Sequence, residues 1–188
     1  MHNDNDTRSA SNGPGVVISA ATLAEIPALH RLVEGAYRGD TARAGWTHEA
    51  DLLDGQRTDL PALADMIADP RQRLLMVRDA GCLVGCVGIT DQGAGRAYLG
   101  MLTVAPGQQA QGIGRRLIDA AEQTAQAQFA AHIMEMTVIV QRTELIAWYL
   151  RCGYVLTGET RPFPYGNARF GDPRTSDLEF VVLTRALG

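Results

Sequence analysis

The chain has 188 residues, a mass of 20.2 kDa and 46% hydrophobic residues, which suits a single globular domain. All 17 basic residues are arginine, so Schiff-base and lysine-base catalysis are excluded, and a net charge of −4 without a basic stripe disfavours a nucleic-acid partner. No apolar run approaches the ~20 residues that cross a bilayer, so we expect a cytoplasmic protein with no membrane partner.

Residues 1–15 are polar and lack the apolar core of a secretory signal, so we expect a disordered leader before one domain over 16–188. Apolar periodicity and turn signals predict the first elements in chain order. A strand at 16–20 is followed by a helix after Thr22, whose apolar residues are Leu23, Ile26, Leu29 and Val33. A helical turn at 46–53 and a helix at 60–68 come next, and then strands at 73–79, 82–90 and 96–104. The three strands are separated by short turns and should form an antiparallel meander.

In the second half, Leu117 and Ala121 recur at helical spacing and predict a helix of about four turns that starts at Ile113. The patterns after it predict a strand at 132–140, a helix that contains Tyr149, and strands at 154–158 and 178–185. The connection 159–174 carries three aromatics and three prolines, which favours an ordered lid over a flexible linker.

A glycine-bearing turn joins the strand that ends at Val104 to the helix that starts at Ile113. Glycines let the backbone approach a ligand closely, and the unpaired N–H groups of a first helical turn attract anions. A P-loop is excluded, because Ile113-Gly114 stands where that motif needs Lys followed by Ser or Thr. The dinucleotide fingerprint is disfavoured, because Leu117 stands where it needs a small residue.

The pattern that remains is Gln109-Ala110-Gln111-Gly112-Ile113-Gly114. It resembles motif A of the GNAT acetyltransferase superfamily, which binds the pyrophosphate of acetyl-CoA. Downstream, Trp148-Tyr149 precedes Gly153-Tyr154, which resembles the second GNAT signature. The two motifs occur in the order and at the separation that this fold requires.

The resemblance implies an α/β (α+β) GNAT fold: a mixed, mostly antiparallel sheet of six to seven strands flanked by helices. It also implies a splay between the strands at 96–104 and 132–140. Backbone groups freed by the splay, together with the turn, would bind acetyl-CoA as co-substrate. The residues that match this site are Leu102, Thr103, Val104, Gln109, Ala110, Gln111, Gly112, Ile113, Gly114 and Arg115, with Arg116 as an alternative to Arg115. Arg142 stands where the family commonly has an asparagine on the pantetheine arm, and it could instead contact a phosphate or the substrate.

Two catalytic residues follow from the same resemblance. Tyr149 matches the tyrosine that protonates the leaving thiolate. The strand at 96–104 lacks the carboxylate that many members use as general base, so Glu135 on the facing strand is the substitute. Glu49, Asp51 and water alone are the alternatives.

The amine acceptor should bind between the segment at 46–57 and the connection at 159–174, from which we expect contacts by Trp46, Glu49, Arg57, Phe163 and Tyr165. Arg57, Arg161 and Arg169 could bind a carboxylate or phosphate, whereas Glu49 and Asp51 could hold a cationic amine. The histidines and cysteines lack metal spacing, so no metal is expected.

The favoured function is therefore acetyl-CoA-dependent transfer of an acetyl group to a primary amine of a small molecule or peptide, by direct attack in a ternary complex. The alternatives are a non-catalytic acyl-CoA sensor and a transferase that uses a longer acyl-CoA. A homodimer is left open.

Overall fold

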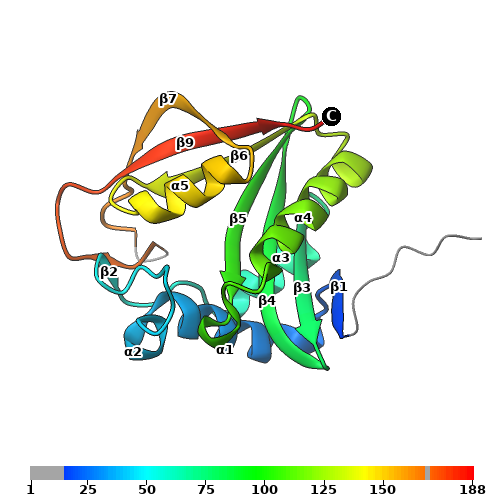
Figure 1. The fold of residues 1–188 in the computed structure, drawn as a ribbon, viewed down its shortest axis with the longest axis horizontal. Coiled ribbons are helices and arrows are strands. Elements are labelled where there is room, and N and C mark those ends of the chain that lie inside the picture. The colour runs from blue at the N-terminus through cyan, green and yellow to red at the C-terminus, as the bar shows by residue number, and fades with distance from the viewer. Residues whose placement is uncertain (1–14, 168–169) are drawn as a thin grey trace, which may run out of the picture.

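The computed structural model describes residues 15–167 and 170–188, so the predicted leader, apart from Gly15, and the candidate Arg169 lie outside the described residues. Seven strands form one mixed sheet in the order β1-β3-β4-β5-β6-β9-β7, and two short strands, β2 and β8, pair beside it (Figure 1). This confirms the predicted mixed, mostly antiparallel sheet.

The elements follow the predicted order closely. The strands of the main sheet are β1 (Val16–Ala20), β3 (Gln72–Asp79), β4 (Cys82–Gly93), β5 (Arg96–Val104), β6 (Ile133–Ile139), β7 (Val155–Pro162) and β9 (Glu179–Ala186). The helices are α1 (Ile26–Tyr37), α2 (Gly39–Ala42), α3 (Leu60–Ala68), α4 (Ile113–Phe129) and α5 (Thr143–Arg151), and the small sheet contains β2 (Leu53–Asp54) and β8 (Asp172–Pro173).

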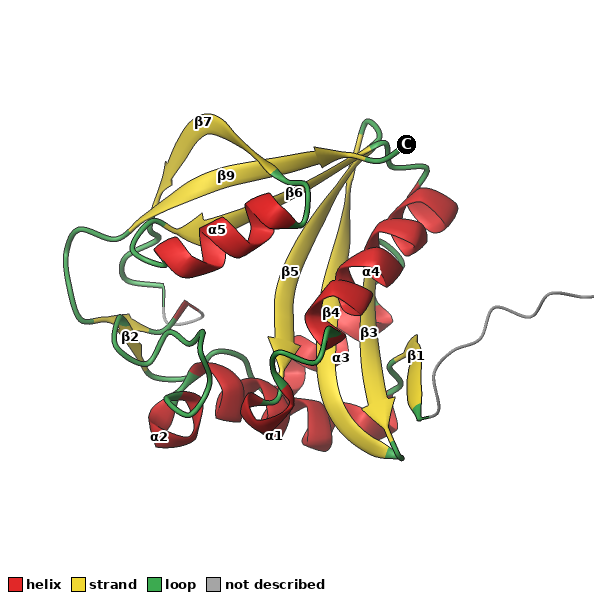
Figure 2. Ribbon diagram, viewed as in Figure 1, coloured by secondary structure: helices red, strands yellow, loops and turns green. Residues whose placement is uncertain are grey.

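The alternating side chains of β3 separate two apolar cores. Leu75 and Val77 belong to the core beneath α4 and α5, whereas Leu74 and Met76 belong to the core beneath α1 and α3. This division follows from the two-residue period of a strand, which sends successive side chains to opposite faces. The sheet therefore lies between two helical layers, and Figure 2 shows α4 and α5 on the face toward the viewer.

The predicted splay is present between β5 and β6. The two strands pair in parallel only at Arg96–Tyr98 and Ile133–Glu135, and beyond these residues they diverge into a V that is visible in Figure 1. Within β5, Met101 has a positive φ of 51°, and the register with β4 shifts at the same place. Such a bulge bends the strand, and here it places Met101 in the α1 and α3 core although Leu99 belongs to the opposite core.

Three details differ from the prediction. Leu23 lies in a short 3-10 turn before α1 and is exposed, so the helix buries only Ile26, Leu29 and Val33 of the four predicted residues, together with Ala36. Residues 46–52 form bends and turns instead of a helical turn, and Leu53 begins β2. The connection at 159–174 is shorter than expected, because β7 continues to Pro162 and β8 adds a second strand. No helix in the described part of the chain is long and apolar enough to span a membrane.

Candidate functional site

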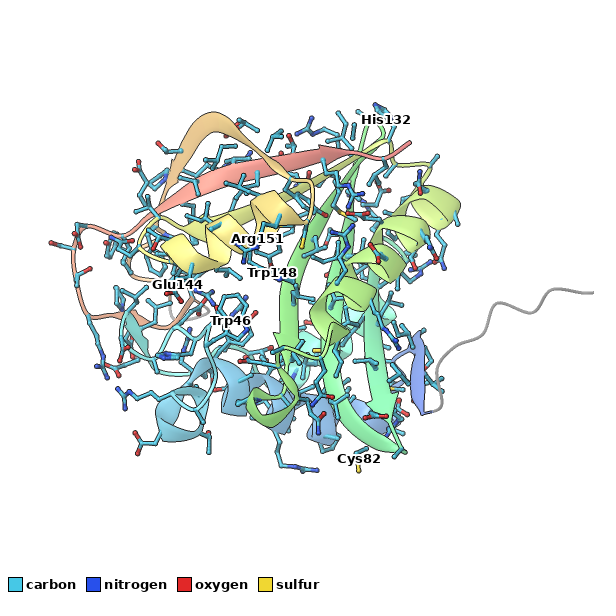
Figure 3. All side chains as sticks on the ribbon, viewed as in Figure 1. Trp46, Cys82, His132, Glu144, Trp148 and Arg151 are labelled. Atoms are coloured by element: carbon cyan, nitrogen blue, oxygen red, sulfur yellow. The ribbon has the colours of Figure 1, made fainter. Side chains whose placement is uncertain are left out.

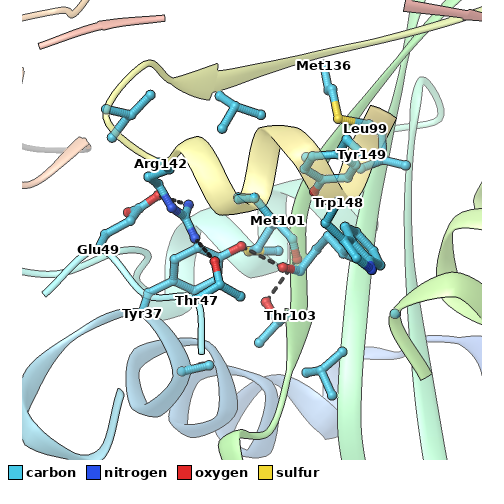
Figure 4. Close-up of a pocket in the computed structure, with 18 of the residues that line it drawn as sticks. Tyr37, Thr47, Glu49, Leu99, Met101, Thr103, Met136, Arg142, Trp148 and Tyr149 are labelled. Atoms are coloured by element: carbon cyan, nitrogen blue, oxygen red, sulfur yellow. Dashed lines mark hydrogen bonds and ion pairs between the residues drawn. The ribbon is translucent and has the colours of Figure 1, made fainter. Parts of the chain in front are cut away.

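A cavity of about 840 Å³ occupies the opening of the V between β5 and β6. It extends from the start of α4 to the segment at 46–57, and α5 forms one wall (Figure 4). Most of the residues predicted for ligand binding meet there: Leu102, Thr103, Val104, Gln109, Ala110, Gly112, Ile113, Gly114, Arg115 and Arg142 line the cavity, as do Trp46, Glu49, Arg57, Phe163 and Tyr149.

The start of α4 presents free donors to this cavity. Gly112 is the N-cap with a positive φ of 77°, Ala110 also has a positive φ of 67°, and none of the described side chains caps the helix. The first helical bond at this end runs from the Arg116 N–H to the Gly112 carbonyl, so the N–H groups of residues 113–115 have no acceptor within the helix. This is the geometry that binds a phosphate group.

Gly114 shows why the turn needs a second glycine. A Cβ at Gly114 would lie 3.3 Å from two ring carbons of Trp148, so the indole packs directly on the first turn of α4. Trp148 also meets Trp46 edge to face, with ring centroids 6.2 Å apart, and the two rings lie side by side at the cavity (Figure 3). The turn, α5 and the segment at 46–57 thus converge through aromatic contacts.

The free edge of β5 is reached by a tyrosine from α1. The Tyr37 hydroxyl donates a hydrogen bond of 2.6 Å to the Leu102 carbonyl, within the stretch where β5 has left β6 (Figure 4). Burial raises the pKa of Tyr37, so its hydroxyl stays protonated and remains a donor. Sequence analysis missed Tyr37; the available signal was a tyrosine four residues after Val33 on the buried face of the helix.

Tyr149 projects from α5 into the same cavity, beside Leu99 and Met136 (Figure 4). Its ring packs edge to face against Trp148 and Tyr154, with centroid distances of 5.0 and 5.9 Å. Burial raises the pKa of Tyr149 far above its ordinary value of 10.0. The hydroxyl therefore stays protonated near neutral pH, where it can donate a hydrogen bond but cannot act as a base.

Glu49 is buried among three arginines. Its Oε2 accepts from Arg38 at 2.6 Å, its Oε1 accepts from Arg142 at 3.0 Å, and Arg57 lies 3.9 Å away. Burial alone would raise the pKa of Glu49, but the positive charges of Arg142, Arg57 and Arg38 outweigh it and lower that pKa. A carboxylate held in this way is a weak base, although it lines the cavity.

Arg142 connects the start of α5 to the segment at 46–57. Besides Glu49, its guanidinium donates to the Thr47 hydroxyl at 2.6 Å and lies over the Tyr37 ring at 5.9 Å. The position that commonly holds asparagine in the family is thus occupied by a side chain that faces the segment at 46–57. Gln109 makes a second connection, because its side chain accepts from the Trp46 N–H at 2.9 Å and donates to the Val104 carbonyl.

Three predicted site residues do not line the cavity. Glu135 is bound by Arg96 at 2.6 Å and by Arg161 at 2.8 Å. Burial alone would raise its pKa, but the hydrogen bonds and charges of the two arginines lower that pKa, so the structure does not support Glu135 as the base. Tyr165 accepts a hydrogen bond from the Leu178 N–H and supports the connection between β7 and β9, while Gln111 is exposed outside the cavity.

Two other predicted alternatives also lie elsewhere. Asp51 contacts Arg43 at 3.3 Å and does not line the cavity, and neither does Arg116. Conversely, the sequence analysis missed several residues that do line it, including Tyr98, Thr137 and Arg151. Tyr98 and Thr137 come from β5 and β6, and their hydroxyls are 2.7 Å apart, a pairing that only the register of the two strands reveals.

Comparisons with known proteins agree with this geometry. The family model for the acetyltransferase (GNAT) family matches residues 30–154. No curated protein sequence matches the chain.

Among solved structures, a mutant of spermidine N-acetyltransferase from Vibrio cholerae is similar, with a TM-score of 0.67, 17% identity, and coverage of 93% of this chain and 95% of that one. The ribosomal-protein-S18-alanine N-acetyltransferase from Escherichia coli gives a TM-score of 0.67, 14% identity, and coverage of 92% and 94%. The acetyltransferase yncA from Salmonella typhimurium, solved with its cofactor acetyl-CoA, gives a TM-score of 0.66, 17% identity, and coverage of 95% of both chains. With a family model that spans most of the sheet and both motifs, the chain belongs to the GNAT family of acetyltransferases.

Proposed function

We propose that the protein transfers the acetyl group of acetyl-CoA to a primary amine of a small molecule or peptide, by direct attack within a ternary complex. The observation that carries this proposal is the convergence of three features on one cavity: the free N–H groups at the start of α4, the unpaired edge of β5, and the Tyr149 hydroxyl. Each feature supplies one requirement of thioester aminolysis.

The residues present fit acetyl-CoA. The N–H groups of residues 113–115 and the Arg115 side chain suit the pyrophosphate, and Arg151 at the end of α5 adds a second positive charge to the same cavity. The edge of β5 at Met101–Val104 suits the amide groups of a pantetheine arm, since no described strand pairs with it on that side. Acetyl-CoA supplies the activated acyl group.

Tyr149 is the proposed general acid. Its hydroxyl lies in the cavity and is protonated near neutral pH, so it can stabilise the leaving thiolate by a hydrogen bond and pass a proton to it. No cysteine or other nucleophile is needed, because a neutral amine attacks a thioester directly. Cys86, whose pKa burial raises to about 12, belongs to the α1 and α3 core and does not line the cavity.

The amine must lose a proton before it attacks. Among the described residues, Glu49 is the only carboxylate that lines the cavity, and three arginines surround it. The acceptor therefore binds as the neutral amine or gives its proton to water. Of the bases considered from the sequence, water is the one that this geometry supports.

The test is a steady-state assay of thiol release from acetyl-CoA against amines, amino acids and peptides, with acetyl-CoA binding measured separately by calorimetry. Tyr149→Phe should lower kcat by about 10²-fold and leave the Kd for CoA unchanged. Tyr165→Phe is the matched control, because it removes a hydroxyl outside the cavity. An unchanged kcat in Tyr149→Phe would refute the assigned acid.

Binding without release for every acceptor would favour the acyl-CoA sensor instead. Faster turnover with longer acyl-CoA thioesters would instead favour a transferase that uses a longer acyl-CoA. Met101 and Met136 line the cavity, so their truncation should then alter acyl preference.

A further inference from the structure

The cavity is positively charged although the whole chain carries a net charge of −4. Its lining contains four arginines, Arg57, Arg115, Arg142 and Arg151, and one carboxylate, Glu49. Arg115 lies at the start of α4 and Arg151 at the end of α5, where phosphates of the acyl donor would bind. Arg57 and Arg142 lie with Glu49 on the acceptor side, so the donor does not account for their charge.

Glu49 cannot neutralise this group. Its two oxygens already accept short hydrogen bonds from Arg38 and Arg142, and behind the cavity Nε and Nη2 of Arg38 are buried without a partner among the described residues. Among the described residues, Glu49 is the only carboxylate within 4.0 Å of the guanidinium groups of Arg38, Arg57 and Arg142, and Glu34 acts on Arg57 from farther away, so a surplus of positive charge remains. This surplus of positive charge lies on the acceptor side of the cavity.

Of the three arginines around Glu49, Arg57 is the one whose guanidinium remains free to bind a ligand. Its guanidinium makes one long contact, 3.9 Å to Glu49, and donates no hydrogen bond to any residue within 15–167 or 170–188. The backbone N–H of Arg57 is held by Glu34 at 2.7 Å, and the guanidinium stacks over the Tyr37 ring at 5.1 Å. The group is therefore positioned before a ligand arrives, with a planar set of donors that matches a carboxylate.

Arg57 is also close to the expected reaction centre. The ring that it covers belongs to Tyr37, whose hydroxyl is bonded to Leu102 in the splay. A second cavity of about 240 Å³ adjoins the first, and Arg57, Tyr98 and Met101 line both. A small acceptor could place its amine at the splay and its side chain toward the second cavity while an anionic group reaches Arg57.

We propose that the acceptor is an amine that carries a carboxylate, of the α-amino-acid class, and that Arg57 binds this carboxylate. The inference rests on the proposed N-acetyl transfer and names its substrate class. Polyamines are poor acceptors for this cavity, because a multiply charged cation would meet a surplus of arginine and a carboxylate that is already engaged. The substrate of the similar Vibrio cholerae structure, spermidine, therefore does not carry over.

The test compares amino acids with the amines that result from their decarboxylation: phenylalanine with phenethylamine, and methionine with 3-(methylthio)propylamine. Spermidine is included, and rates are expressed per neutral amine. In the wild type, kcat/KM for each amino acid should exceed that for its partner at least tenfold. Arg57→Met keeps an apolar chain over Tyr37 and should reduce this preference to near unity without changing the Kd for CoA.

Arg78→Met is the control, because this arginine lies on β3 outside the cavity and should leave the preference intact. Equal or faster turnover of the decarboxylated amines in the wild type would overturn the inference, and so would an Arg57→Met variant that slows both members of a pair equally. In either case N-acetyl transfer itself would stand.

Product binding separates the two proposals. N-acetylphenylalanine should bind the wild type at least tenfold more tightly than N-acetylphenethylamine, and Arg57→Met should abolish the difference. If this pattern appears but no amine is acetylated, the carboxylate site is supported and the proposed function fails. If binding shows no dependence on the carboxylate, the inference fails whatever the activity.

Discussion

Replacing Glu49 by glutamine tests the buried charge cluster most directly. The change keeps the size of the side chain, so it creates no cavity, but it removes the one negative charge between Arg38, Arg142 and Arg57. The side chains of Glu49 and Arg38 are only 10% and 7% exposed, so the buried charge of Arg38 has little solvent to compensate it when Glu49 is neutral. Removing one member of such a buried pair costs about 3–5 kcal/mol.

For a chain of this length, ~1 kcal/mol shifts Tm by roughly 2–4 °C, so Glu49→Gln should lower Tm by about 6–20 °C at pH 7. Urea unfolding followed by circular dichroism measures the same loss. Asp40→Asn is the control: it removes an exposed partner of Arg43 and should change stability little.

The pH dependence gives a second check. Because the folded pKa of Glu49 is lowered, its contribution to stability is complete above its ordinary pKa of 4.5 and is lost as pH falls through the folded pKa. The difference between wild type and Glu49→Gln should therefore be largest near neutral pH and shrink in acid. A variant as stable as the wild type at pH 7 would refute the argument that the arginines depend on this carboxylate.

Three further outcomes are expected. Glu135→Gln should cost about 1.5–3 kcal/mol of stability by freeing two arginines, yet retain kcat in the thiol-release assay; a large loss of kcat would restore Glu135 as the base. Without a side-chain base, kcat/KM should rise with pH up to the pKa of the acceptor amine, and two acceptors of different amine pKa should give correspondingly displaced profiles; a common inflection would reveal an enzyme group. Gly112→Ala should cost about 1–2 kcal/mol, because the N-cap has a positive φ of 77°, and should weaken CoA binding measured by calorimetry, whereas Gly107→Ala should not, because Gly107 does not have a positive φ and a Cβ there meets nothing within 4 Å.

Local patterns in the sequence were enough to predict the seven strands of the main sheet, the helices α1, α3, α4 and α5, and the turn before α4, but not α2, β2 or β8. Strand periodicity, the helical spacing of Leu117 and Ala121, and the glycines at 112 and 114 each depend on neighbours a few residues away. The splay between β5 and β6 was expected from the family resemblance, since nothing in the composition of Arg96–Val104 marks where pairing ends. The bulge at Met101 has no sequence signal either, because a methionine with positive φ is held there by its surroundings.

The roles of charged residues are harder to predict from the sequence, for a physical reason. Glu135 was chosen as base because it lies on the facing strand, but its pKa depends on Arg96 and Arg161, which are 39 and 26 residues away. Glu49 likewise depends on Arg142, 93 residues later in the chain. Sequence shows which groups can titrate, whereas the long-range partners that decide their pKa values appear only after folding.

The parallel pairing between β5 and β6 is short and joins the two halves of the main sheet. Three residue pairs, from Arg96 with Ile133 to Tyr98 with Glu135, connect one half of the sheet with α4 to the other half with α5. The walls of the cavity belong to different halves, and the two halves share the core beneath α4 and α5, so a movement of one half relative to the other would change the shape of both. A ligand that contacts both α4 and α5 would hold the two halves of the sheet together. Amide hydrogen exchange at these three pairs would then slow although no ligand atom touches them.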